Sequence, residues 1–533
     1  MHTFLSYILF AAGIGAVVSQ AVKYLRVAQR EHYLPTFVTK FALRWSTSSS
    51  LNTVLFLLSA ISLLLSSLGY IWTFPATAAL FVSPWGLTWR GQTSPLKWTR
   101  RLKTTALTTL LIISALTSAI FVGTSLETTD VALVICAFLM PAILDLTLFI
   151  LTPIEKQLAS KYVNAARTKL QKINPINVAI TGSYGKTSTK TYLAHILEKN
   201  YQVLASPKSF NNKAGLARTI NEGMTFSTEV FVAEMGTFGP GEIRNMCSWV
   251  VPKIAAITAV GPVHLERFRK IENIAQAKAE ITEKAEVVVL NTDSSYLAKL
   301  AAALEKTGKK IIKVSAEDEK TDLCIKTDTG DSLSDETQKS QWSLFSAGAH
   351  LADIDAANLS GGVVPINLAV AMAIALELKC PLETIILALR DLPQASNRLN
   401  IETLPDGTIL LDDTYNSNPA GAAFALSRLE LLGSDSTKKI IVTPGMVELG
   451  PQRKIANEKL GYEAAKRATH LVVVKNTNKK SILAGAKKYQ SESGKNMVIK
   501  TVPDRKQAVA FVKAILAPGD VVLYENDLPD HYP

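Results

Sequence analysis

The sequence predicts an N-terminal α-helical membrane bundle followed by two α/β domains, a central P-loop domain and a Rossmann-like C-terminal domain. Long apolar runs without charge are concentrated before about residue 152. A short apolar strand pattern at 176–181 leads through a glycine-rich loop into a helical pattern at 189–197. Strand and helix patterns then alternate to about residue 524. We therefore expect a bundle at 1–152, a linker helix at 153–175, a central domain at 176–395 and a last domain at 396–533.

Five apolar segments in the first part predict about five transmembrane helices. They are residues 4–22, 51–68, 70–87, 104–123 and 131–151. Runs of this length suffice for a helix to cross the hydrocarbon core. The first segment has neither the basic start nor the cleavage site of a signal peptide, which favours a retained helix. The third contains Pro75 and Pro84, so a re-entrant or broken helix is an alternative there.

Charge asymmetry predicts the orientation of these helices. Basic residues are clustered after the first segment and before the fourth: Lys23, Arg26, Arg30, Lys40 and Arg44, then Arg90, Lys97, Arg100, Arg101 and Lys103. The connection at 125–130 carries only Glu127 and Asp130 as charges. Since Lys and Arg are retained on the cytoplasmic side, we expect a multi-pass cell-membrane protein with cytoplasmic catalytic domains.

The membrane helices are either a passive anchor or part of a site. Asp145 lies within the fifth segment, where an ionisable group usually faces the bundle interior or marks a site; near the end of a span it can also reach the interface. Many of the Lys and Arg residues behind the net charge of +12 lie beside the apolar runs or are scattered among Glu and Asp further along the chain. No nucleic-acid partner is therefore expected. Four Cys without ligand spacing predict a reducing compartment and no zinc site.

The glycine-rich loop predicts a phosphate-binding site. Gly182-Ser183-Tyr184-Gly185-Lys186-Thr187-Ser188 lies between a buried strand and a helix. Glycines let backbone N–H groups approach phosphates, and the helix N-terminus adds positive potential. Lys186 would reach the terminal phosphates of ATP and Thr187 would bind Mg²⁺. The alternative is a structural turn.

Residues 181–188 resemble the TGxxGKTS signature of the Mur ligases, which join an amino acid or peptide to a carboxylate through an acyl phosphate. Further motifs follow in the family's order. Asn211 and Asn212 resemble its substrate loop, Glu234 in VAEMG its magnesium glutamate, and His264 in VHLERF its metal-binding histidine. The alternative for Glu234 is a glutamate that caps a helix. The alternative for His264 is a solvent-exposed histidine or one that is hydrogen-bonded within the protein. The resemblance extends from about residue 173 to 525.

The same resemblance implies roles for residues further along the chain. Lys278 lies in a segment similar to one whose lysine is carbamylated in several members; an exposed helix lysine is the alternative. Asn291 matches an Asn beside the nucleotide base, and Arg398 an arginine near the domain junction.

Residues 412–419 are similar to the DDxYNxNP motif of members that add D-alanyl-D-alanine. Asp413 would accept from a ribose hydroxyl and Tyr415 would cover the nucleotide. Asn416 and Asn418 would orient substrate or form the turn before Pro419.

The resemblance implies an ATP- and Mg²⁺-dependent ligase in peptidoglycan precursor synthesis. It would add a D-alanyl-D-alanine-like amine, an amino acid or dipeptide, to a muramoyl-peptide carboxylate. Soluble members carry a UDP-binding domain where this sequence has room for one linker helix, so the acceptor is expected to be UDP- or lipid-linked. The alternatives are a poly-amino-acid or polyglutamate-type ligase and, from another class, a nucleotide-driven membrane transporter or switch.

Overall fold

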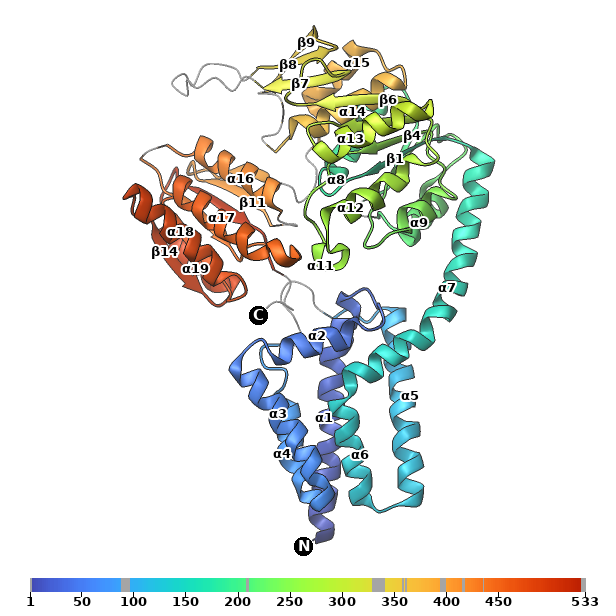
Figure 1. The fold of residues 1–533 in the computed structure, drawn as a ribbon, viewed down its shortest axis with the longest axis vertical. Helices are drawn as coiled ribbons and strands as arrows, with labels where there is room; N and C mark the ends of the chain where they lie inside the picture. Colours follow the sequence, from blue (N-terminus) through green and yellow to red (C-terminus); the bar gives the residue numbers. More distant parts are fainter. Residues whose placement is uncertain are drawn as a thin grey trace. The chain divides into compact units, whose positions relative to one another are not determined.

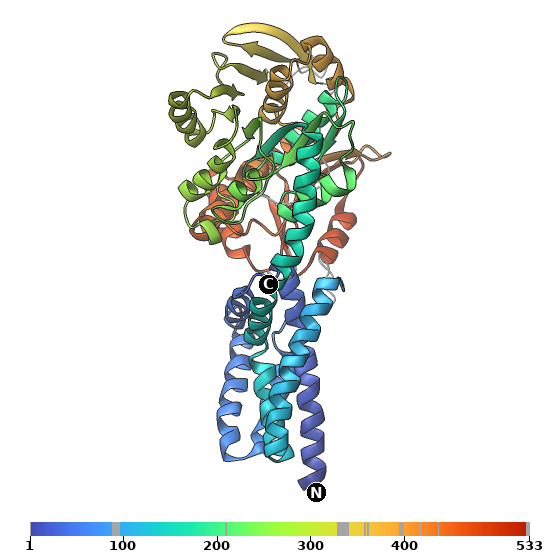
Figure 2. The same ribbon diagram turned by 90° about the vertical axis from the view of Figure 1, so that its right-hand side faces the viewer.

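The computed structural model describes residues 2–87, 96–207, 210–327, 341–356, 359, 362–393, 399–414, 418–434 and 436–528 (Figures 1 and 2). The chain divides into two compact units, residues 1–158 with 528–533, and residues 159–527.

The first unit is a bundle in which α1, α3, α5 and α6 run along one another, whereas α2 lies across one end (Figures 1 and 2). Serine or threonine side chains cap α3, α5 and α6, where Ser49, Thr99 and Ser125 accept backbone N–H groups from the first turn. The elements are α1 (His2–Arg30), α2 (Phe37–Ser46), α3 (Ser50–Leu65), η1 (Ser66–Leu68), η2 (Tyr70–Trp72), α4 (Thr73–Val82), α5 (Arg100–Gly123), α6 (Leu126–Phe138) and the first part of α7 (Met140–Ile173).

Among the described residues of this unit, three helices are long and apolar enough to cross a membrane: Ser6–Arg30, Ser50–Leu68 and Arg100–Gly123. Helices α6 and α7 meet this criterion together, but they are bent by 72° at the break between them. The segment expected at 70–87 forms a shorter apolar helix over Tyr70–Val82. It ends two residues before Pro84, because the residue that precedes a proline is held out of the helical conformation.

Asp145 has a structural partner within the bundle. Its carboxylate accepts the backbone N–H groups of Val38 at 3.3 Å and Thr39 at 2.9 Å. These are orphan donors of the first turn of α2, and Thr36, the N-cap residue, gives them no side-chain hydrogen bond. A negative charge at a helix N-terminus is also stabilised by the helix dipole. Asp145 therefore fixes the start of α2, a helix that the apolar pattern did not predict.

The second unit contains two sheets. The first sheet has nine strands in the order β2-β3-β1-β4-β5-β6-β7-β8-β9, parallel up to β7 and antiparallel beyond it. Its elements are β1 (Ile176–Thr181), α8 (Lys186–Leu197), β2 (Val203–Ala205), α9 (Lys213–Gly223), β3 (Val230–Glu234), α10 (Glu242–Cys247), β4 (Ile254–Ile257), α11 (Leu265–Phe268), α12 (Ile271–Ala279), η3 (Glu280–Thr282), β5 (Val287–Asn291), α13 (Ser295–Leu304), η4 (Glu305–Thr307), β6 (Lys310–Ser315), β7 (Leu323–Thr327), β8 (Gln341–Ser346), β9 (Ala349–Asp355), α14 (Pro365–Glu377), α15 (Leu382–Ala388) and η6 (Leu389–Asp391).

Alternate residues of the central strands enter two cores. In β1, Val178 and Ile180 pack with α8 and α14, whereas Ala179 packs on the other face. That second face is covered by helices that include α9, α10 and α13 and by the end of α7, through Val163 and Leu170. The strands are buried on both sides, as expected of a parallel sheet.

The second sheet has six strands in the order β10-β11-β15-β12-β13-β14, with only β10 antiparallel to its neighbour. Helices α16, α17 and α18 pack on one face and α19 on the other. Its elements are β10 (Asn400–Thr403), β11 (Ile409–Asp413), α16 (Pro419–Leu432), β12 (Lys439–Thr443), η7 (Gly450–Gln452), α17 (Arg453–Arg467), β13 (His470–Val474), α18 (Lys479–Ser493), β14 (Val498–Val502), α19 (Arg505–Ile515) and β15 (Val521–Glu525).

Candidate functional site

The candidate site lies at the carboxyl ends of β1, β3, β4 and β5. The chain leaves β1 towards one edge of the sheet and leaves β4 towards the other, which makes a crevice at the ends of these neighbouring strands. Ligands of open α/β sheets bind at such switch points. The glycine-rich loop follows β1, Glu234 ends β3, and Asn291 ends β5.

Two glycines of the loop meet neighbours that leave no space for a side chain. A Cβ atom on Gly182 would lie 2.0 Å from Oγ1 of Thr258. Gly185 has φ +86°, and its Cβ would lie 2.2 Å from Oδ1 of Asn367 on α14. Gly185 also directly precedes α8, so the loop delivers its backbone to a helix N-terminus. This arrangement is the one in which backbone N–H groups bind phosphate.

The polar side chains of the loop are held in place by backbone atoms. Lys186 donates from Nζ to the carbonyl of Gly182 at 2.8 Å, so its ammonium lies over the loop. Ser183 accepts the N–H of Gly261 at 2.9 Å and donates to its carbonyl at 3.0 Å. Ser188 is buried in the first turn of α8. The loop is therefore fixed to the segment that follows β4.

Glu234 is the centre of a buried polar cluster next to Thr187. One carboxylate oxygen accepts from Thr187 at 3.0 Å and from Nζ of Lys190 at 2.9 Å. The other accepts from Asn211 at 3.1 Å. Burial favours the protonated form of Glu234, but the ammonium groups of Lys190 and Lys186 outweigh this effect, and the pKa of Glu234 is lowered. The carboxylate is therefore ionised and ready to bind a cation.

The donor set at Glu234 fits magnesium. The Thr187 hydroxyl and the Glu234 carboxylate are hard oxygen ligands, and Mg²⁺ in nucleotide sites takes one or two carboxylates together with phosphate and water oxygens. Within the described ranges, no three His, Cys, Asp or Glu side chains gather as a metal-binding group. A site made of one carboxylate, one hydroxyl and substrate phosphates does not need such a group.

Lys278 on α12 is buried, whereas the sequence alternative was an exposed lysine. Its pKa is lowered well below the ordinary value, mainly by burial and also by the positive charge of Lys186. A lysine in such surroundings tends to be neutral, and a neutral amine is the form that adds carbon dioxide.

His264 contacts the second part of the unit. Its Nδ1 lies 2.5 Å from a carboxylate oxygen of Glu448, and the carbonyl of Glu448 accepts from the N–H of Leu265 at 2.9 Å. The ring also makes an edge contact with Phe238 at 5.0 Å between centroids. The structure thus pairs the predicted metal-binding histidine with Glu448, which lies in the sequence Gly-Met-Val-Glu-Leu-Gly at residues 445–450.

Two of the predicted substrate asparagines cap helices. Asn212 accepts the N–H of Gly215 at the start of α9, and Asn418 accepts the N–H of Gly421 at the start of α16, each at 2.9 Å. Asn211, in contrast, faces Glu234.

Asn291 donates to the carbonyl of Thr258 at 2.8 Å and accepts the N–H of Asp293 at 3.0 Å.

Asp413 ends β11 and accepts from the N–H of Leu399 at 3.3 Å. The predictions for Arg398, Tyr415 and Asn416 lie outside the described residues.

Sequence reasoning missed Lys190, Asn367 and Glu448. The sequence does contain a signal for Lys190, because it lies one turn after Lys186 in a helix whose other residues are mostly apolar or small. In the structure, Lys190 is only 4% exposed. A lysine on a buried helix face requires an acidic partner. Asn367 and Glu448 lie in segments that resemble family motifs, but no local pattern predicted their contacts with Gly185 and His264, which join segments more than 180 residues apart.

Comparisons with known proteins agree with this geometry. The family described as Mur ligase middle domain matches residues 180–375, and the Mur ligase, glutamate ligase domain matches residues 397–524. The UDP-N-acetylmuramoyl-tripeptide–D-alanyl-D-alanine ligase of Mycobacterium leprae is 31% identical over 373 residues, which are 65% of this chain and 70% of that protein. The protein of the same name from Mycobacterium bovis is 30% identical over 369 residues, 65% and 69% of the two chains.

Solved structures show the same fold for the second unit. MurF from Acinetobacter baumannii superposes with a TM-score of 0.58 at 22% identity, covering 69% of this chain and 77% of that one. The MurF ligase from Thermotoga maritima, solved with ADP, gives 0.57 at 23% identity, covering 69% and 80%.

Proposed function

Since the chain belongs to the Mur ligase family and is an ATP-dependent ligase, we propose that it joins a D-alanyl-D-alanine-like amine to a muramoyl-peptide carboxylate in peptidoglycan precursor synthesis. The observation that carries the proposal is the cluster of Lys186, Thr187 and Glu234 at the switch point of the first sheet. The motif at 412–419, similar to that of D-alanyl-D-alanine-adding members, supports the choice of amine.

The residues of the first sheet would act on the phosphates. Mg-ATP supplies a phosphoryl group that converts the acceptor carboxylate into an acyl phosphate, and the amine then displaces phosphate to give the amide. The backbone of the loop 182–188 binds the phosphate oxygens. Lys186 would neutralise the charge that develops on the transferred group, and Thr187 and Glu234, which are hydrogen-bonded to each other, would hold Mg²⁺.

Lys278 and His264 would serve a second cation position. As a carbamate, Lys278 would change from a buried neutral amine into an anion, which the positive charge of Lys186 would stabilise. His264 would offer a ring nitrogen to this cation once Glu448 is displaced from it. Asn211, which already contacts Glu234, would bind the substrate side of the site.

The last domain, 396–533, would close over the nucleotide as a Rossmann-like domain. Asp413 would accept from the ribose, Asn291 and Tyr415 would contact the base, and Arg398 would act at the domain junction. Asn416 would orient the amine substrate. For Asn418 the cap of α16 favours the alternative role in the turn before Pro419.

The first unit would embed the protein in the cell membrane. Three helices of sufficient length and apolarity support this, together with the basic residues at one end of the bundle. The bundle would span residues 1–152 and the linker 153–175, with the ligase domains in the cytoplasm. The acceptor would then be used at the membrane surface.

The test measures ADP release by the purified full-length protein as amines and acceptors are varied. We expect release that requires both D-alanyl-D-alanine and a muramoyl-tripeptide acceptor. Lys186→Ala should abolish it, whereas the matched variant Lys161→Ala, at an exposed position of α7, should leave it unchanged. Release with glutamate in place of the dipeptide would indicate a polyglutamate-type ligase. ATP hydrolysis without any amine would indicate a transporter or switch and would refute the proposal.

A further inference from the structure

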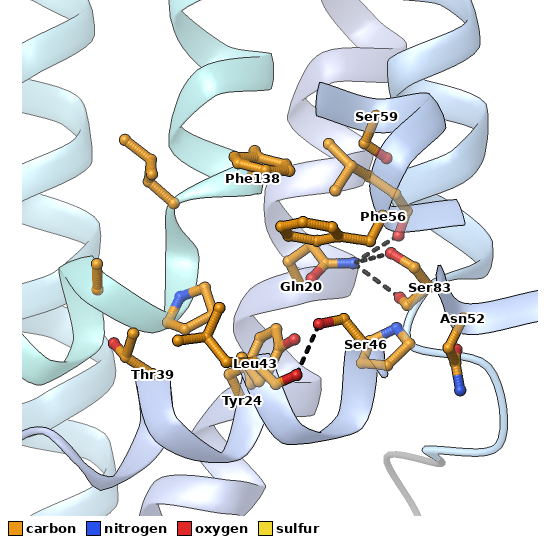
Figure 3. Close-up of a pocket in the computed structure, with 16 residues that line it drawn as sticks. Gln20, Tyr24, Thr39, Leu43, Ser46, Asn52, Phe56, Ser59, Ser83 and Phe138 are labelled. Carbon is orange, nitrogen blue, oxygen red and sulfur yellow. Dashed lines mark hydrogen bonds between the residues drawn. The ribbon is translucent and has the colours of Figure 1, made fainter. Parts of the chain in front are cut away.

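The helical bundle encloses a cavity that the ligase chemistry does not use. Its volume is about 170 Å³, and it lies between α1, α2, α3, the end of α4 and the break between α6 and α7 (Figure 3). Leu43, Phe56, Phe138 and Leu139 supply much of its apolar wall. Phe56 and Phe138 are stacked at 5.4 Å between ring centroids, which fixes one side of the cavity.

Four polar side chains of the wall are already hydrogen-bonded within the protein. The amide of Gln20 donates to the carbonyls of Leu80 at 2.5 Å and Ser83 at 2.8 Å. Ser46 and Ser59 donate to carbonyls of their own helices, and Asn52 exchanges hydrogen bonds with the backbone of Trp85. Because these four side chains are satisfied internally and large apolar side chains line much of the rest of the wall, the cavity favours an apolar occupant over a polar ligand.

The mouth of the cavity is apolar and open. Three large apolar residues of the wall remain exposed: Leu43 by 56%, Leu139 by 46% and Phe56 by 38%. They come from α2, the α6–α7 break and α3, so the opening lies on the side of the bundle. Leu139 lies at the break where α6 and α7 are bent by 72°. In a bundle embedded in a membrane, such a mouth admits a lipid chain.

Positive charge lies on the same helix as the mouth residue Leu43. Lys40 and Arg44 are exposed on α2, one turn apart, and lie over the rings of Phe37 and Phe41 at 5.2 and 5.8 Å. They lie at the end of the bundle where the basic residues gather. An apolar chain in the cavity therefore places its headgroup beside two cations, which selects an anionic headgroup such as phosphate.

We propose that this cavity binds the chain segment next to the headgroup of a prenyl-phosphate-linked carboxylate acceptor, so that the first unit takes part in substrate selection. The volume is close to that of a cavity that holds one benzene ring, about 150 Å³, and so accommodates one branched five-carbon unit rather than a whole chain. Helix α7 leads directly from the bundle into β1, so an acceptor held here stays close to the membrane end of that helix. This inference rests on the proposed ligase function for the identity of the carboxylate, but not for the binding of the chain.

The binding test uses full-length protein in detergent and a farnesyl phosphate probe that carries a diazirine on its first isoprene unit. We expect photolabelling of peptides from α2, α3 or the α6–α7 break. Ala42→Phe places a phenyl ring in the cavity and should reduce labelling at least tenfold. The matched variant Ala11→Phe, on an exposed part of α1, should label as the unchanged protein does.

A second variant and two further probes keep the test decisive if Ala42→Phe folds poorly. Leu43→Glu, at the mouth, should repel the phosphate and also reduce labelling, without filling the cavity. A farnesyl alcohol probe and a dodecyl phosphate probe should label at least fivefold less. Equal labelling by all three probes, or undiminished labelling of both variants, would overturn the inference.

Turnover separates this inference from the ligase proposal. With the same muramoyl-peptide carboxylate, Ala42→Phe should raise KM at least tenfold for the prenyl-linked acceptor and leave kcat and the KM of a soluble UDP-linked acceptor unchanged. Normal use of both acceptors by the variant would overturn the inference while the ligase function stands. Specific labelling without amine-dependent ADP release would instead support chain binding and refute the ligase proposal.

Discussion

Replacing Glu234 by Gln should destabilise the ligase unit, because it leaves the ammonium of Lys190 buried without this counter-charge. The two groups are 2.9 Å apart and 4% and 1% exposed. At an effective dielectric constant of about 20, their attraction is 332/(20 × 2.9), or about 6 kcal/mol. Desolvation offsets part of it, but removal of one partner of a buried pair still costs about 3–5 kcal/mol. If the domain predicted at 176–395 unfolds by itself, its size gives a fall in its unfolding temperature of about 6–20 °C.

The measurement is the thermal unfolding of full-length protein followed by tryptophan fluorescence, since Trp249 lies in the core of the first sheet. The double variant Lys190→Met/Glu234→Gln should unfold at a higher temperature than Glu234→Gln alone, because it removes both charges. Glu222→Gln, which removes an exposed partner of Arg218, is the matched control and should have no effect. A Glu234→Gln transition at the wild-type temperature would refute the reasoning.

The contribution of ionised Glu234 to the free energy of unfolding should depend on pH in a definite direction. The pKa of Glu234 is lowered in the folded protein, so the folded state binds fewer protons than the unfolded state in the range between the two pKa values. The contribution is therefore fully present above the ordinary glutamate pKa of about 4.3 and is lost as pH falls through the folded value. The stability difference between wild type and Glu234→Gln should shrink below about pH 4, and a difference that grows there would contradict the assignment.

Three further predictions follow from the site and the bundle. Lys278 should carry a carbamate. With ¹³C-bicarbonate, the ¹³C spectrum of the protein should contain a carbamate signal that Lys278→Ala lacks, and ligase activity should rise with bicarbonate. An unchanged spectrum in Lys278→Ala would show that the signal comes from another amine. Asn418→Ala should cost about 1 kcal/mol of stability, measured by denaturant unfolding, with little change in the KM of the amine, because the side chain caps α16; a large KM effect at unchanged stability would favour the substrate role. Cysteine placed at Ser125 should react with an impermeant maleimide in intact cells, whereas cysteine at the exposed Ser434 should react only after permeabilisation, and the reverse pattern would contradict the predicted orientation.

Local patterns in the sequence determined the chemistry of the site. The strand–glycine loop–helix at 176–197 needs only neighbouring residues to form, and Lys186 and Thr187 follow at fixed positions on the helix N-terminus. The position of the apolar runs and the basic clusters likewise depends on composition alone, which is why the helical bundle was predicted before its packing was known.

Tertiary structure decided which of the remaining polar residues meet. Glu234 finds Thr187 and Lys190 across 44 to 47 residues of chain because β1 and β3 are paired in parallel register, which no local pattern reports. Asn212 and Asn418 match substrate motifs in sequence, but each caps a helix, since the same amide oxygen serves either purpose. The break between α6 and α7, and with it the cavity at Leu139, arises where two apolar stretches that read as one span pack at an angle. Periodicity determines which face of an element is buried, whereas the contacts between distant elements depend on how those faces pack together.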